Sequence, residues 1–146
     1  MTYTEMLEYN DFVLRLSQEH KTIFVKALLY MANIDGKRDE NEIQYIKKAI
    51  LAYKLRDIQA MFQPTTEEEL LEELQTFDDR RTCLELIKEL CLLGHADGDL
   101  SDQETLFIGH AGLAMGIDLE KIEEISNWTI DKIIWLEQGK IIFEDQ

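Results

Sequence analysis

The sequence has little cysteine, proline or glycine. Its two cysteines among 146 residues, Cys83 and Cys91, lie eight positions apart in a segment of helical periodicity. That spacing is roughly 12 Å along a helix axis, too far for a disulfide. One proline and seven glycines supply few turns, which disfavours a many-stranded sandwich or barrel. Two reduced thiols suit a cytoplasmic protein, and we expect that location.

Basic residues and long apolar runs are also scarce. The chain has 15 Lys and Arg against 30 Asp and Glu, a net charge of −15. So acidic a surface repels nucleic acid and anionic lipid. No apolar run approaches the ~18 residues of a membrane span, and Met1–Glu5 shows no secretion signal. We expect divalent cations and proteins as partners, either basic proteins or a membrane-associated complex; acidity that only confers solubility is the alternative.

Apolar periodicity predicts an all-α fold. Apolar residues recur at helical spacing almost throughout, and strict alternation is not sustained. The tail, Lys140–Phe143, is the one candidate strand. The length fits a single domain over residues 1–146. We predict seven or eight helices, at about 3–15, 18–33, 40–54, 56–62, 66–76, 78–96, 102–116 and 119–143, the last broken near Asn127.

Capping residues and glycines mark the predicted helix ends. Ser101 and Glu104 have the spacing of a capping box. The other start signals are Ser17, Asp39 with Glu42, Thr65 with Glu68, and Asp118. Gly98 and Gly116 lie where a left-handed residue commonly closes a helix. Gly109, Gly112 and Gly116 also predict close helix–helix contact, because glycine costs about 1 kcal/mol within a helix.

The sequence contains an internal repeat. A shift of 62 residues places Val25–Leu55 over Ile87–Ile117 without a gap, and nine of the thirty-one positions are identical. Each copy is a helix, an Asp-Gly loop and a second helix. We therefore predict two helix-loop-helix repeats, about 18–55 and 78–117, followed by C-terminal helices over 119–143. The repeats are expected to pack about a pseudo-twofold axis in one globule.

The two Asp-Gly loops gather acidic residues. In both, Asp is followed by Gly and, seven positions after the Asp, by Glu. Carboxylates and free helix-end carbonyls are the hard oxygen ligands that Ca²⁺ and Mg²⁺ prefer. We predict a cation site, with Ca²⁺ favoured over Mg²⁺ or Zn²⁺. The second loop ranks first because Lys37 and Arg38 lie in the first loop. The candidate ligands are Asp97, Asp99 and Glu104, then Asp35, Asp39 and Glu42.

A metal-free reading of the same loops stays open. Glu42 and Glu104 have capping-box positions, and Asp35 and Asp97 can make side-chain turns after a helix. The spacing is not that of an EF-hand, which needs Gly at position six and Glu at position twelve of its loop.

The doubled motif resembles the TerB-like family, named after tellurite-resistance proteins. The resemblance covers roughly residues 20–140 and rests on Ile34-Asp35-Gly36 and Ala96-Asp97-Gly98, each followed by a Glu that opens the next helix. It implies an all-helical fold with pseudo-twofold halves, an acidic metal-associated site, and a role in stress-response assemblies without known catalysis. The matching acidic positions are Asp35, Glu42, Asp97 and Glu104; Asp39 and Asp99 lie at unmatched offsets.

Other chemistry-bearing residues give weaker patterns. We interpret His95 and His110 as ordinary helix-face residues, and the sequence shows no His-Asp companion for Ser17, Ser101 or Ser126. The absence of catalytic motifs predicts a non-enzyme. A deep pocket lined by carboxylates of raised pKa would instead favour an unrecognised enzyme.

Trp128 and Trp135 lie seven residues apart on one helix face. We expect them in the core, with an exposed anchor for a partner as the alternative. The sequence as a whole predicts a TerB-like, divalent-cation-binding interaction module of a stress-response system. The alternatives are a metal-independent adaptor that uses its acidic surface and an unrecognised enzyme.

Overall fold

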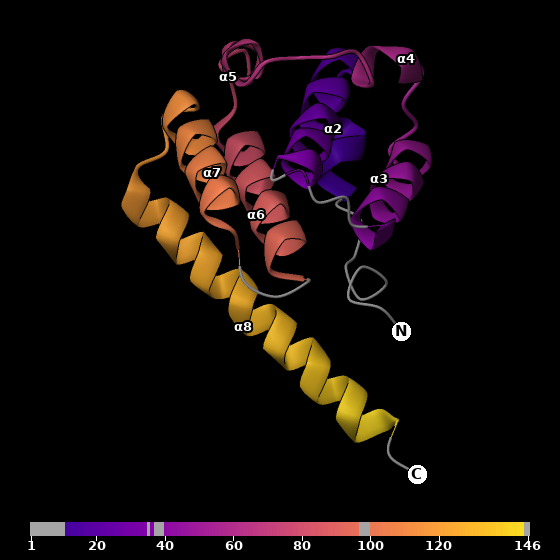
Figure 1. The fold of residues 1–146 in the computed structure, drawn as a ribbon, viewed down its shortest axis with the longest axis vertical. Coiled ribbons are helices and arrows are strands. Elements are labelled where there is room, and N and C mark those ends of the chain that lie inside the picture. The colour runs from indigo at the N-terminus through magenta and orange to yellow at the C-terminus, as the bar shows by residue number, and fades with distance from the viewer. Residues whose placement is uncertain (1–10, 35, 37–39, 97–99, 145–146) are drawn as a thin grey trace.

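The computed structural model describes residues 11–34, 36, 40–96 and 100–144. Within these residues the chain forms helices and no strands, which confirms the all-α prediction. A short 3-10 helix is followed by seven α-helices (Figure 1). Their bounds are η1 Asp11–Arg15, α2 Gln18–Asn33, α3 Glu40–Ala52, α4 Ile58–Met61, α5 Glu67–Leu74, α6 Arg80–Ala96, α7 Asp102–Ala114 and α8 Leu119–Phe143.

Three of the seven described α-helices begin at a predicted cap. The Ser17 hydroxyl accepts from the His20 backbone N–H at 3.1 Å, and Asp118 accepts from Lys121 at 2.8 Å. Ser101 and Glu104 form the full capping box. The start of α5 was predicted one residue too early, because Thr66 and not Thr65 accepts from the Glu69 backbone N–H, at 3.1 Å. The predicted Asp39 cap lies outside the described residues.

Three predicted details of helix extent are wrong. Residues 11–15, expected as the end of an α-helix over 3–15, form a 3-10 helix instead, and the earlier part lies outside the described residues. The α8 helix runs unbroken through Asn127, and its last residues include the candidate strand Lys140–Phe143. An Asn costs less than about 1 kcal/mol in a helix, so without Gly or Pro nearby the packing of α8 on its neighbours keeps it continuous.

Two helix pairs form the centre of the molecule. The first is α2 with α3, the second is α6 with α7, and α2 packs against α6 between them. The α5 helix packs on α7 and α2, and α4 packs on α2. The α8 helix lies across α6 and α7 and then extends beyond the rest of the molecule (Figure 1). None of the described helices is long and apolar enough to cross a bilayer.

The core lies where these pairs meet. Phe24 and Leu28 of α2, Leu90 of α6 and Phe107 of α7 are fully buried there. Both cysteines are free and buried, as their spacing predicts. Burial of such side chains stabilises the fold by about 1.5–3 kcal/mol each.

Most residues that the internal repeat aligns have matching burial, although Ile43 is buried and its counterpart Thr105 is exposed. Buried positions match buried ones: Leu28 with Leu90, Glu42 with Glu104, Tyr45 with Phe107, Ile46 with Ile108, Ala49 with Ala111. The exposed Leu51 matches the exposed Leu113. Each pair therefore turns the same face inward, while the pseudo-twofold relation between the halves stays a prediction.

Glycine has two roles around α7. A Cβ on Gly112 would lie 2.3 Å from Cδ1 of Ile122, so this glycine lets α8 approach α7, as predicted. A Cβ on Gly109 or Gly116 would meet nothing within 4 Å, so the prediction of close contact at these two glycines is wrong. Gly116 has φ +79° and closes α7 in the left-handed region, as predicted.

Candidate functional site

Only part of the predicted cation site falls in the described residues. Asp35, Asp39, Asp97 and Asp99 lie outside them. Glu42 and Glu104 are both buried at the starts of their helices. Among the described residues, no group of three or more His, Cys, Asp or Glu side chains could hold a metal ion. Cation binding at the loops therefore stays a prediction.

Glu104 has a structural role in the capping box. Its Oε1 accepts from the Ser101 backbone N–H at 2.9 Å, and its own N–H donates to the Ser101 hydroxyl at 3.1 Å. These two bonds satisfy donors that the first turn of a helix would otherwise leave unpaired. A cation at this corner would have to share a carboxylate that is already engaged.

Two of the three histidines, His95 and His110, join helices. His110 Nδ1 lies 3.0 Å from Glu67 Oε1 of α5 on the exposed side. His95 Nε2 lies 3.0 Å from the Ser126 hydroxyl of α8. The Ser126 hydroxyl also hydrogen-bonds the Cys91 thiol, whose burial raises its pKa to about 12. Sequence reasoning missed this cluster because 31 residues separate His95 from Ser126. The cluster lies in the α6–α8 contact, where it holds the two helices together.

A second polar cluster lies on α6 and was also missed. Burial raises the pKa of Glu89. The nearby charge of Lys88 lowers it and that of Glu85 raises it, and the resulting pKa is about 7. The Tyr45 hydroxyl donates to Glu89 Oε2 at 3.3 Å, and Lys88 Nζ lies 3.6 Å from Glu89 Oε1. Lys88 also pairs with Glu85 at 2.6 Å. A carboxylate with raised pKa is one part of the enzyme alternative.

The groove beside this cluster does not include that carboxylate. A groove of about 350 Å³ between α6 and α8 is bordered by Glu85, Lys88 and Trp128. Glu89 is 3% exposed and is not among the residues that line the groove. It faces Tyr45 and Lys88 instead, so we assign it to the packing of α6.

Trp128 and Trp135 are exposed, so the expectation that they belong to the core is wrong. Their exposed fractions are 51% and 71%. A different stripe of α8 faces the body, with Ile122 and Thr129 buried and Ile125 and Ile133 packed against the core. The Lys132 ammonium lies 5.8 Å from the centre of the Trp128 ring, which favours the exposed position of this indole.

Among the described helices, α8 carries the most large exposed apolar side chains, and most of these lie at its end. We call residues 134–143 the α8 tip. Its strongly exposed members are Ile134, Trp135, Ile141, Ile142 and Phe143. Trp128, Trp135 and Ile142 recur every seven residues, as do Ile134 and Ile141. Such a seam is typical of a helix that packs against another helix.

The charge of the α8 tip differs from that of the chain. Residues 134–143 hold one base, Lys140, and one acid, Glu137. The tip is therefore locally neutral in a molecule with a net charge of −15. Depletion of charge around aromatic and aliphatic side chains is typical of the centre of a protein interface.

Comparison with known proteins found no match: no family model, no curated protein and no solved structure is similar to this chain.

Proposed function

We propose that this chain is a protein-interaction module and that the α8 tip is its binding element. The observation that carries the proposal is the exposure of five large apolar side chains on a helix that extends beyond the domain. Monomeric proteins rarely expose large contiguous apolar patches, and such patches commonly mark interaction sites. The proposal corresponds to the metal-independent adaptor alternative, but with an apolar binding surface in place of an acidic one.

The spacing along the seam indicates the chemistry of the partner. Apolar residues at seven-residue intervals pack best against a second amphipathic helix, which inserts its own side chains between them. Because the tip is locally neutral, the partner surface is apolar and needs no strong basic charge. A cytoplasmic setting, supported by two free buried cysteines, is part of the proposal.

The stress-response role and the cation belong to a wider hypothesis. The TerB-like resemblance implies both, and they rest on the sequence motif alone. Cation binding would act at the loops, whereas the α8 tip lies at the far end of a different helix (Figure 1). The two ideas can therefore be tested on separate variants.

Site-specific photo-crosslinking in cells tests the α8 tip. A photoreactive residue at Ile141 should give discrete adducts that disappear when Trp135→Asp is added. The control is the same residue at Leu51, which is 76% exposed on α3. Adducts equal at both positions, or none at Ile141, would contradict the proposal. Mass spectrometry of each adduct identifies the chain that was captured.

A further inference from the structure

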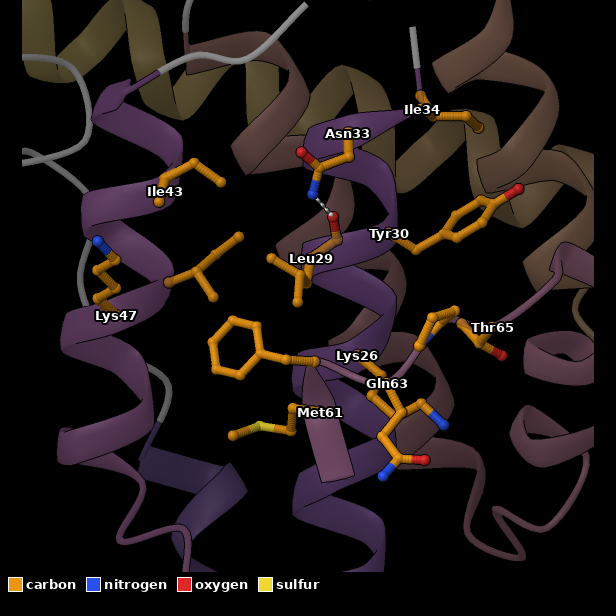
Figure 2. A pocket seen from close by; sticks show the side chains of 13 residues that line it. Lys26, Leu29, Tyr30, Asn33, Ile34, Ile43, Lys47, Met61, Gln63 and Thr65 are labelled. Carbon is orange, nitrogen blue, oxygen red and sulfur yellow. Dashed lines mark hydrogen bonds between the residues drawn. The ribbon is translucent and has the colours of Figure 1, made fainter. Parts of the chain in front are cut away.

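A cleft of about 530 Å³ lies between α2, α3 and the segment that follows α4. Figure 2 shows Leu29 and Asn33 of α2 facing Ile43 and Lys47 of α3 across it, whereas Lys26 lies beside Gln63. Met61 and the chain up to Thr65 border the third side. The volume is within the range of cavities that hold a ligand or several large side chains.

The wall formed by α2 has a counterpart that another helix covers. The internal repeat aligns three lining residues of α2 with three residues of α6: Lys26 with Lys88, Leu29 with Cys91, and Asn33 with His95. Lys88 borders the α6–α8 groove, and Cys91 and His95 both hydrogen-bond Ser126 of α8. The stripe of α6 that receives α8 is therefore repeated on α2, where it faces the cleft.

On this face, only the short α4 helix and the segment after it pack over the first helix pair, within the described residues. The α4 helix has four residues, and Phe62, which follows it and lines the cleft, remains 52% exposed. The Asn33 side chain hydrogen-bonds within its own helix, donating to the Leu29 carbonyl at 2.9 Å. An amphipathic helix end would bury this surface as α8 buries the matching surface of α6.

Charge favours a particular end of such a helix. Lys26 pairs with Glu73 at 2.6 Å, whereas no ion pair of Lys47 occurs among the residues that the structure describes. The C-terminal end of a helix carries a partial negative charge, and α8 ends at the acidic Glu144. The positive charge of Lys47 at the cleft is thus complementary to the end of α8.

We propose that the α8 tip of one copy docks in the α2–α3 cleft of a second copy. This inference rests on the proposed function and names its partner. The tip does not reach the cleft of its own chain, since its apolar side chains stay exposed. Reciprocal exchange of two tips would give a closed twofold dimer, the commonest symmetry of soluble oligomers.

Sedimentation equilibrium over a range of protein concentrations tests the dimer. The unmodified chain should dimerise, and Trp135→Asp on the tip or Phe62→Asp in the cleft should each weaken dimerisation by about tenfold or more. Both side chains are exposed, so the variants should fold, which circular dichroism checks. The matched control is Leu51→Asp, an exposed residue of α3 that does not line the cleft; it should leave the dimer intact.

A mixing experiment distinguishes tip-in-cleft docking from pairing of two tips. Trp135→Asp keeps an intact cleft, and Phe62→Asp keeps an intact tip. Mixed together, the two variants should form heterodimers through one remaining contact, although each alone is monomeric. If two tips paired with each other, Phe62→Asp would dimerise alone, and that result would overturn the inference.

The remaining outcomes separate this inference from the proposed function. A monomeric unmodified chain at every concentration, or a dimer insensitive to Trp135→Asp, overturns tip-in-cleft docking. If the crosslinker at Ile141 then captures a different protein, the interaction module stands without self-association. If Ile141 captures nothing, both proposals fail.

Discussion

The two helix pairs have similar sequences, but the helices that pack over them differ in length. In α2–α3 and α6–α7, most aligned residues have matching burial, from the buried Leu28 and Leu90 to the exposed Leu51 and Leu113. A 25-residue helix lies across the second pair, whereas the four-residue α4 packs on α2 of the first. The repeated sequence thus determines how each pair packs internally. Segments outside the repeat determine which outer faces remain open.

The pairs also differ in their buried charges, and Glu89 is the most deeply buried of these. Glu89 of α6 is buried beside Lys88 and Tyr45, and the repeat aligns it with Ala27, which is equally buried on α2. A charge at such a position is costly unless it is paired. The second pair therefore has a pH-sensitive core position that the first pair lacks.

The largest expected effect tests whether the two pairs are equivalent inside. Leu28→Ala and Leu90→Ala each remove a fully buried side chain, so each should lower the free energy of unfolding by about 2–5 kcal/mol. Urea denaturation gives both values. If the two losses of unfolding free energy differ by more than the experimental error, the helices that cover each pair, and not the repeated packing within the pair, determine core stability.

The next effect concerns Glu89 and pH. Its pKa of about 7 in the fold lies above the ~4.3 of an unfolded Glu, so the folded state holds the proton more tightly. Its contribution to stability is present below the unfolded pKa and is lost as pH rises to about 7. The loss should be about 3–4 kcal/mol.

Glu89→Gln provides the comparison, because the amide cannot ionise and can still accept from Tyr45. The stability difference between variant and unmodified chain should grow from pH 4.5 to 7 and then level off. The measurement is urea denaturation at several pH values. A difference that is constant with pH would mean that Glu89 titrates normally.

A smaller effect concerns the contact between α7 and α8. Gly112→Val would overlap with Ile122 and should destabilise the chain by about 1–3 kcal/mol. Gly109→Ala, one helical turn away in open space, should stabilise it by up to about 1 kcal/mol. Thermal unfolding of both variants checks the signs. Equal signs would indicate that α8 does not approach α7 closely.

These comparisons also show what the sequence could predict. Helices and three of their caps follow from local signals, such as the Ser101–Glu104 box, and are confirmed. Trp128 and Trp135 were misplaced because periodicity shows which residues share a face, but not which apolar face of α8 meets the domain. Two faces of α8 are apolar, so the packing of α8 against α6 determines which of them is buried.

The candidate sites depend on residues far apart in sequence. The link from His95 to Ser126 and the cleft between α2 and α3 both need the tertiary arrangement, which no local pattern gives. The repeat comes closest to predicting the cleft, since it aligns Leu29 with Cys91. Sequence alone does not show that α8 covers one of these residues and leaves the other open.

The smallest effect on stability separates capping from cation binding at the second loop. Glu104→Gln should cost less than about 0.5 kcal/mol without added metal, because Gln also serves in a capping box. If the loops bind Ca²⁺ as the sequence predicts, calcium should raise the melting temperature of the unmodified chain, and Glu104→Gln should reduce that increase. Carboxylate charge, and not the cap geometry, is what a cation needs.

Ser101→Ala is the matched control for that experiment. It removes the capping hydroxyl, which costs ~1 kcal/mol, but it leaves every candidate ligand in place. The variant should therefore melt earlier and keep the full response to calcium. If neither the unmodified chain nor Ser101→Ala responds to millimolar calcium, the buried Glu42 and Glu104 serve only to begin their helices, and function rests on α8 alone.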